Sequence, residues 1–167
     1  NWHINFSGSV MSKELAKKHW FNGSSLPVNF CDIIENIKEY SDFELFVGCD
    51  SHKISEKYVF ATVIALHKPG KGGHFFFYRK KAKDNRFDNI RVRLLEETQL
   101  AINVATLIKK HFPNKSVAIH LDINDDPCYR SSVVLQPATA YVISSGFQVA
   151  IKPLSWASSS LADAFAK

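Results

Sequence analysis

The sequence has few cysteines and no long hydrophobic run. Its 167 residues include only three cysteines, Cys31, Cys49 and Cys128, and none of them forms a Cys-x-x-Cys pair. A disulfide framework is therefore not expected, and a reducing compartment is the simplest expectation. No stretch approaches the roughly eighteen apolar residues of a membrane span, and the first residues lack the basic-then-apolar order of a signal peptide. We expect a cytoplasmic protein with no membrane-spanning segment.

The composition predicts one globular unit with a basic surface. Hydrophobic residues make up 46% of the chain, which is enough to bury a core of ordinary size. No internal repeat, low-complexity tract or linker divides the sequence, although residues 1–40 are predicted to be a helical extension before the main domain, residues 41–167. The formal net charge of +5 makes nucleic acid a reasonable partner, because Lys and Arg attract phosphates irrespective of base sequence.

The order of the predicted elements is that of an α/β protein. Helical patterns in residues 1–40, one of them containing Met11, Leu15 and Trp20, precede three strands rich in Val, Ile, Phe and Tyr. The short segments "KISE" and "PGKGG" separate these strands, which predicts an antiparallel meander. Asp88 is the expected N-cap of a long helix. The predicted strands cover residues 44–49, 57–67, 73–81, 115–124 and 147–153, and the predicted helices cover residues 88–111, 131–145 and 159–167. Such an order predicts a mixed sheet covered by helices.

The helix predicted over residues 88–111 carries an acidic residue on its hydrophobic side. At about 100° per residue, Glu97 falls within the apolar stripe, whereas Glu96 points to the polar side. The stripe comprises Ile90, Leu94, Ala101, Val104, Ala105 and Ile108. A buried, unpaired carboxylate is destabilising, so Glu97 needs a cation, a hydrogen-bond network or a wet cleft. An ion pair with Arg93 on the helix surface is the alternative to a metal site.

Three aspartates complete a set of four acidic residues spread over the predicted elements. Asp50 follows the apolar residues of "ELFVGCDSH", Asp122 lies in the strand "VAIHLDIN", and Asp163 lies among alanines in the last helix. Asp122, near the end of its strand, is expected at an opening where clefts of α/β sheets form. Each residue also has a simpler interpretation, with Asp50 as a turn former, Asp122 as a loop cap and Asp163 as a solvated helix residue.

Metal-assisted phosphoryl transfer is the chemistry that requires several carboxylates at one site. A dense carboxylate cluster raises its own pKa values unless cations neutralise it, and hard divalent cations prefer oxygen ligands. Two such ions about 4 Å apart can activate a water and stabilise the leaving oxygen of a phosphodiester. The sequence therefore predicts a site for two Mg²⁺ or Mn²⁺ ions. Its candidate ligands are Asp50, Glu97, Asp122 and Asp163.

Several stretches of the chain together resemble a known family. In order, they are "FVGCDSH", "VIALH", "GGHFFFYR", "LLEET", "IHLDIN" and "KPLSWASSSLAD". From about Val10 to its end, the chain resembles the YkuK-type family of small predicted RNase H-like nucleases. The resemblance implies an RNase H-like fold, with a five-stranded mixed sheet whose first three strands are antiparallel and with helices on both sides. It also implies two-metal catalysis, in which Asp50 bridges the ions. In that scheme, Glu97 and Asp122 hold one ion each or share them, and Asp163 completes the second site.

Residues near the predicted metal site are candidates for auxiliary roles. Ser51 and His52 could contact a phosphate or orient a water, and capping of a loop is an equal alternative. A cationic run follows the third strand, and a solvated sheet edge is its simplest interpretation. In a nuclease, the residues expected to contact nucleic acid are Arg79, Lys80, Lys81, Arg91, Arg93 and Lys152. Trp156 is a candidate for base stacking or, alternatively, for the hydrophobic core.

The function predicted from these residues is a metal-dependent nuclease that hydrolyses phosphodiester bonds in RNA, DNA or an RNA/DNA hybrid. The alternatives are a noncatalytic nucleic-acid-binding module and a partner-binding protein on the same fold. A noncatalytic module has no reason to keep acidic groups near phosphates, which favours the nuclease. The preferred nucleic acid, its strandedness, the mode of cutting and the oligomeric state stay open.

Overall fold

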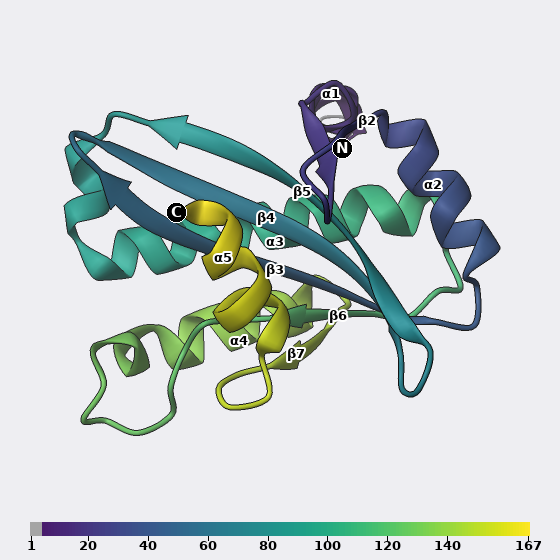
Figure 1. The fold of residues 1–167 in the computed structure, drawn as a ribbon. Coiled ribbons are helices and arrows are strands. Elements are labelled where there is room, and N and C mark those ends of the chain that lie inside the picture. The colour runs from purple at the N-terminus through teal and green to yellow at the C-terminus, as the bar shows by residue number, and fades with distance from the viewer. Residues whose placement is uncertain (1–4) are drawn as a thin grey trace.

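The computed structural model describes residues 5–167, which fold around one seven-stranded sheet (Figure 1). The strand order is β2–β1–β5–β4–β3–β6–β7. The strands are β1 Trp20–Asn22, β2 Pro27–Val28, β3 Glu44–Ile54, β4 Lys57–Lys68, β5 Gly72–Ala82, β6 Val117–His120 and β7 Gln148–Ala150. The α-helices are α1 Asn5–Ala16, α2 Phe30–Glu39, α3 Ile90–His111, α4 Leu135–Ser144 and α5 Asp163–Ala166. Two 3₁₀ segments, η1 Asn85–Asp88 and η2 Arg130–Val134, and a π-helical segment, η3 Ala157–Ala162, complete the elements.

The three long strands form the predicted antiparallel meander. β3 pairs with β4 from Glu44 opposite His67 to Ile54 opposite Lys57, and β4 pairs with β5 along its whole length. The turn between β4 and β5 contains Gly70 with a positive φ of 77°, a backbone conformation that glycine adopts without steric strain. The meander is therefore confirmed, and β3 continues five residues further than expected.

The sheet is mixed, as predicted, but it has seven strands instead of five. β6 returns from α3 to pair in parallel with β3, and β7 pairs in parallel with β6. The two additional strands are a β1–β2 hairpin added to the free edge of β5. The turn of this hairpin, residues 23–26, lies within the region predicted to be a helical extension.

Trp20 was predicted to be helical and is instead the first residue of β1. Its indole packs against Tyr78 of β5, with ring centroids 4.8 Å apart, and against Phe30 of α2, at 5.6 Å. A spacing of three hydrophobic residues over ten positions does not distinguish a helix from a strand that packs on two other elements. The first four residues of the predicted N-terminal extension lie outside the described residues, and the domain boundary at residue 40 stays a prediction.

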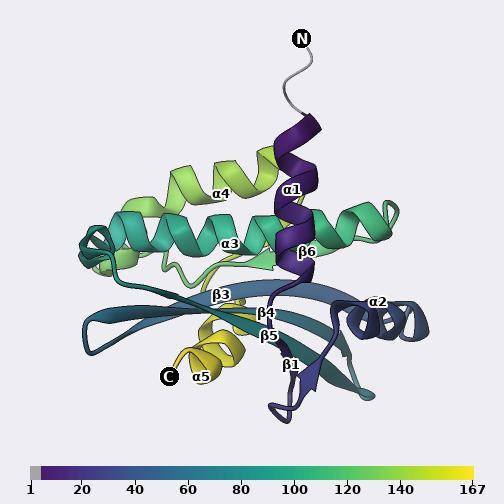
Figure 2. The same ribbon diagram turned by 90° about the horizontal axis from the view of Figure 1, so that it is seen from above.

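The two faces of the sheet are covered by different parts of the chain. α3 and α4 pack on one face, with α1 crossing over α3, while α5 lies on the opposite face (Figure 2). The main hydrophobic core therefore lies on the α3 side. A smaller cluster of Val63, Phe77 and Ala162, with Phe165 packed beside it, joins the C-terminal segment to the other face.

The long helix begins one residue later than predicted. Asn89 is its N-cap, and the Asn89 Oδ1 accepts a hydrogen bond from the backbone N–H of Arg91. Asp88, the predicted cap, ends η1 and accepts hydrogen bonds from Lys53 and from the hydroxyl of Tyr58. Asn and Asp are both suitable N-caps. Asp88 does not cap the helix because its carboxylate is bound by Lys53 and Tyr58 of the neighbouring meander.

Candidate metal centre

Asp50 and Asp122 lie side by side where the parallel pairing of β3 and β6 ends. The last register pair of that ladder is Gly48 opposite His120. Asp50 lies two residues further along β3, whereas Asp122, expected within its strand, lies two residues beyond the end of β6. Residues two apart on a strand point to the same face of a sheet. Asp50 therefore faces the side of the sheet that carries the C-terminal helix, as Gly48 does. The Asp122 carboxylate lies near enough for its charge to act on Asp50.

The C-terminal segment approaches this face closely because residue 48 is glycine. A Cβ added at Gly48 would lie 2.6 Å from the backbone carbon of Ala157 and from the backbone nitrogen of Ser158, a separation that a real contact does not reach. The neighbouring His120 accepts a hydrogen bond at its Nδ1 from the backbone N–H of Ala157, at 3.1 Å. These contacts position η3 over β3 and bring Asp163, at the start of α5, above the strand.

Asp50, His52 and Asp163 form one group of donor atoms. Each offers one nitrogen or carboxylate oxygen, and these atoms all lie within 4.8 Å of one another. The His52 Nε2 lies 2.7 Å from the Asp163 Oδ1 and 3.6 Å from the Asp50 Oδ2. The three side chains come from positions up to 113 residues apart in the sequence, so the packing of α5 on β3 creates the group.

Glu97 reaches the same region from the opposite face of the sheet. Its side chain is buried, as the helical periodicity predicted, and its Oε1 accepts a hydrogen bond from the Ser51 hydroxyl at 2.5 Å. Among residues 5–167, Arg93 makes no ion pair with Glu97, and its guanidinium lies 5.5 Å from the centre of the Tyr58 ring. The ion pair considered as an alternative to a metal site is therefore wrong for this helix.

The electrostatics of the four acidic residues indicate a shared site. Burial and the neighbouring Asp122 charge raise the pKa of Asp50 from 3.8 to about 6. Burial and the Asp50 charge raise the pKa of Glu97 well above its ordinary value. Hydrogen bonds from Lys167 and His52 instead hold the pKa of the half-buried Asp163 below its usual range. Two carboxylates are thus destabilised in their charged form, which is the condition that a bound cation relieves.

The donor chemistry of this region fits divalent cations. Carboxylate oxygens of Asp50 and Asp163 and an imidazole nitrogen of His52 form one donor group, and the charges of Asp122 and Glu97 act near it. Hard divalent ions take such oxygen ligands, and imidazole is a ligand for transition ions. The structure places two of the predicted ligands, Asp50 and Asp163, in one donor group with His52. Asp122 and Glu97 lie near enough for charges to act between them and Asp50, and the ligand roles of all four residues stay predictions.

Two lysines form ion pairs with acidic residues of this region. The Lys152 Nζ lies 2.6 Å from the Asp122 Oδ1, and the Lys167 Nζ lies 2.8 Å from the Asp163 Oδ2. Lys152 reaches Asp122 because its backbone N–H donates to the carbonyl of Ile123, which continues the pairing beyond β7. Lys167 was not singled out from the sequence, although its spacing of four residues from Asp163 on a helix is a detectable ion-pair signal.

The other residues expected to contact nucleic acid are distributed over both faces of β5 and the start of α3. Arg79 donates from Nε to the carbonyl of Phe165 at 2.5 Å, and Lys80 forms an ion pair with Glu96 at 2.5 Å. Lys81 and Arg91 are exposed. Arg79 thus holds α5 against the sheet, which is a structural contact independent of any nucleic acid.

Trp156 packs within an aromatic group at the start of η3. Its ring lies 5.0 Å from Phe46, 5.4 Å from His120 and 5.6 Å from His67 between centroids, in edge-on arrangements. Such packing matches the core alternative considered for this residue.

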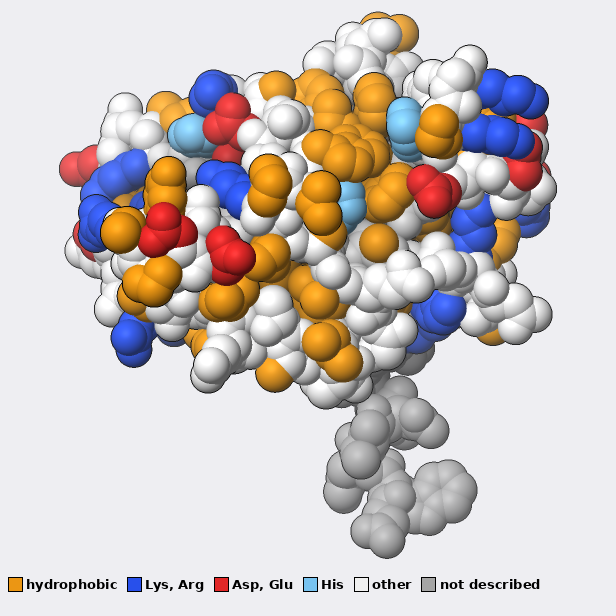
Figure 3. Space-filling model, turned by 90° about the horizontal axis from the view of Figure 1, so that it is seen from below, with side chains coloured by type: hydrophobic (Ala, Val, Ile, Leu, Met, Phe, Trp, Pro, Cys, Tyr) orange, Lys and Arg blue, Asp and Glu red, His pale blue; other side chains and the backbone are white. Residues whose placement is uncertain are grey.

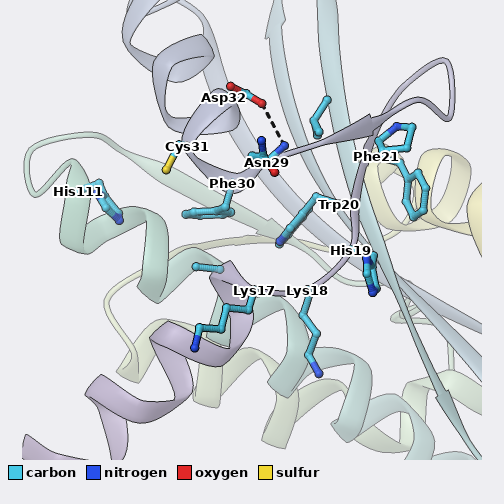
Figure 4. A pocket seen from close by; sticks show the side chains of 13 residues that line it. Lys17, Lys18, His19, Trp20, Phe21, Asn29, Phe30, Cys31, Asp32 and His111 are labelled. Carbon is cyan, nitrogen blue, oxygen red and sulfur yellow. Dashed lines mark hydrogen bonds between the residues drawn. The ribbon is translucent and has the colours of Figure 1, made fainter.

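A large cavity lies away from the acidic residues. It has a volume of about 880 Å³ and opens between α1, β1 and the start of α2 (Figure 4). The labelled side chains around it include Lys17, Lys18, His19, Trp20, Phe30 and His111. None of the four candidate ligands lines this cavity, so the cavity is separate from the candidate metal centre.

The edge of the molecule at α4 and β7 exposes several hydrophobic side chains. Figure 3 shows hydrophobic side chains gathered across the middle of this side, with lysines and arginines toward its two ends. Ile143 on α4 and Leu154 after β7 are 62% and 73% exposed. This distribution suits contact with another protein better than contact with a phosphate backbone.

Ser51→Ala is expected to weaken metal binding at neutral pH. The Ser51 hydroxyl favours the charged form of Glu97 by donating a hydrogen bond, so removing it should raise the pKa of Glu97 further and leave less carboxylate to bind a cation. Calorimetric titration with Mn²⁺ at pH 6.5 and 8 should show a loss of affinity that is larger at the lower pH. Ser51→Thr keeps the hydroxyl and is the control, and equal losses in both variants would contradict the argument.

The comparisons with known proteins agree with this architecture. The family described as "Ribonuclease H-like" matches residues 29–167, and the chain belongs to it. The chain is also 24% identical over 169 residues to a protein of Bacillus subtilis (strain 168) named "Uncharacterized protein YkuK", and the match covers 89% of this chain and 96% of that protein. The predicted resemblance to the YkuK-type family is thereby confirmed. No solved structure matches. None of the helices within residues 5–167 is long and apolar enough to cross a membrane.

Proposed function

We propose that this protein is a divalent-metal-dependent nuclease that hydrolyses phosphodiester bonds in RNA, DNA or an RNA/DNA hybrid. The observation that carries the proposal is the donor group of Asp50, His52 and Asp163 beside Glu97 and Asp122, where burial and neighbouring charges raise the pKa values of Asp50 and Glu97. When bound, two Mg²⁺ or Mn²⁺ ions would supply an activated water and neutralise the developing charge on the leaving oxygen.

The position of each acidic residue indicates the role that it would have in this reaction. Asp50 stands between the other acidic residues, since its pKa responds to the charges of both Asp122 and Asp163, and it is the candidate for contact with both ions. Glu97 approaches from α3, Asp122 from the segment after β6 and Asp163 from α5. Ser51 orients the Glu97 carboxylate by its hydrogen bond, so that the oxygen is held in place before a cation arrives.

Lysines beside the acidic residues support a polyanionic substrate. Lys152 and Lys167 place two ammonium groups next to Asp122 and Asp163. Ions that bind the carboxylates would compete with these ammonium groups, which would then be able to contact substrate phosphates nearby. The net charge of +5 favours the same class of substrate.

Asp122→Asn is expected to abolish metal-dependent cleavage. Asn keeps the shape of the side chain but removes the charge that attracts the cation. End-labelled single-stranded RNA, single-stranded DNA, duplexes and hybrids should be incubated with each protein in Mg²⁺ or Mn²⁺. Cuts made by the wild type and lost in the variant would establish the activity and its substrate together.

Asp125→Asn is the matched control for this assay, because Asp125 is an exposed carboxylate three residues away. It should cleave like the wild type. Equal loss in both variants would indicate a general effect on the loop after β6. Binding of the nucleic acids without any metal-dependent cleavage by the wild type would reject catalysis in favour of a noncatalytic binding module.

A partner-binding function is the second candidate, and the hydrophobic edge at α4 and β7 favours it (Figure 3). The carboxylates would then be structural. Under this alternative, millimolar Mg²⁺ or Mn²⁺ should leave the melting temperature unchanged, whereas ligand linkage requires a rise if the ions bind only the folded chain.

A further inference from the structure

We propose that His52 is a metal ligand, and that the group of Asp50, His52 and Asp163 binds Mn²⁺ in preference to Mg²⁺. This inference rests on the proposed function, because it names the ion that one half of the same centre prefers. It changes the role of His52 from an auxiliary residue that contacts phosphate or water to a direct ligand of the cation.

The geometry places the imidazole between the two carboxylates. The His52 Nε2 lies 2.7 Å from one oxygen of Asp163 and 3.6 Å from one oxygen of Asp50. The three donor atoms lie within 4.8 Å of one another, slightly more than the roughly 4.0–4.4 Å between opposite ligands of an ion bound at about 2.0–2.2 Å, so a small side-chain adjustment would let one ion contact all three. His52 and Asp50 share one face of β3, since they are two residues apart on the same strand.

The position of His52 does not follow from a need for packing. Its side chain is 35% exposed and lies at the open part of the site, whereas His120 on β6 is buried and uses its Nδ1 to hold the backbone of Ala157. A histidine with a purely structural role would resemble His120. His52 instead directs a ring nitrogen at two carboxylates, which is the arrangement that a mixed nitrogen and oxygen site requires.

The donor set determines which ion is favoured. Mg²⁺ prefers oxygen ligands and near-ideal octahedral geometry, while transition ions accept imidazole nitrogen readily. The group of Asp50, His52 and Asp163 offers one nitrogen and carboxylate oxygens, whereas Glu97 and Asp122, whose charges also act here, offer oxygens alone. The centre is therefore asymmetric, with an oxygen-only half that suits Mg²⁺ and a half containing nitrogen that prefers Mn²⁺.

The test measures the bound metal directly and needs no substrate. Electron spin echo envelope modulation of Mn²⁺ bound to the full chain should show coupling to ¹⁴N, and growth with ¹⁵N-labelled histidine should change that coupling. His52→Asn keeps the side chain neutral and replaces the imidazole by an amide. The variant should lose the nitrogen coupling, and its ratio of Mn²⁺ to Mg²⁺ affinity, measured by calorimetry, should fall about tenfold.

His19→Asn is the matched control, since His19 lies at the separate cavity between α1 and β1, and it should retain both the coupling and the affinity ratio. Wild-type Mn²⁺ without nitrogen coupling would overturn the inference even if the variant failed to fold. Cleavage with no nitrogen coupling would reject the ligand role of His52 and leave the nuclease intact. Nitrogen coupling without cleavage would support the metal site and reject the nuclease.

Discussion

Asp50→Asn is expected to abolish metal-dependent cleavage and, at the same time, to stabilise the metal-free protein at neutral pH. Asp50 is 8% exposed, and its pKa of about 6 results from burial and from the charge of Asp122. The rise in the pKa of Asp50 from 3.8 to about 6 means that the charged side chain destabilises the folded state by about 3 kcal/mol at pH 7. Asn removes this charge, so we expect a gain of roughly 1–3 kcal/mol in the free energy of unfolding.

The pH dependence of this difference follows from the direction of the shift. Below pH 3.8, Asp50 is protonated in both the folded and the unfolded chain and contributes no difference. As the pH rises from 3.8 to about 6, the unfolded chain releases its proton first and the wild type loses stability. Urea titrations at pH 4 and pH 7 should therefore show that the free energy of unfolding of the wild type decreases, relative to that of Asp50→Asn, between these two pH values.

The exposed residue Asp125 again supplies the control, and Asp125→Asn should change the unfolding free energy little at either pH. Saturating Mn²⁺ should raise the melting temperature of the wild type and leave that of Asp50→Asn nearly unchanged. A variant that is less stable than the wild type at pH 7 without metal would contradict the claim that Asp50 is held in an unfavourable charged state.

Gly48→Ala is expected to destabilise the fold by about 3 kcal/mol or more and to lower cleavage by about a hundredfold. The added Cβ would overlap the backbone of Ala157 and Ser158, and backbone atoms cannot move aside as the end of a flexible side chain can. η3 would have to lift from β3, and Asp163 at the following α5 would move with it. Thermal unfolding and the cleavage assay measure the two effects.

Gly23→Ala is the control for the loss of a glycine. A Cβ at Gly23 would meet the Phe75 side chain at 3.4 Å, which is an ordinary contact. This variant should stay within about 1 kcal/mol of the wild type and keep its activity. A Gly48→Ala protein that binds metal and cleaves like Gly23→Ala would show that the close approach of η3 is not required.

Local patterns in the sequence were sufficient to predict the central elements of this fold. The hydrophobic stripe of α3 placed Glu97 toward the sheet, and the side chain is buried there. The two short connections between three β-rich segments predicted the meander, because only antiparallel neighbours can be joined by so few residues. The β1–β2 hairpin was missed because its strands are two and three residues long and their stability comes from pairing with β5.

The arrangement of the candidate site depended both on local sequence patterns and on the tertiary structure. The residue types, and the placement of Glu97 on the buried face of its helix, are local properties that the sequence alone determined. Asp50 was expected at the end of its strand but lies inside β3, and Asp122 was expected within its strand but lies beyond β6. Only the tertiary structure decided that His52 meets Asp163, 111 residues away, and that Lys152 pairs with Asp122. The physical reason is that periodicity orients a side chain within its own element, whereas contacts between elements follow from packing. Here the C-terminal segment packs on β3 at Gly48, where the missing side chain lets the two backbones meet.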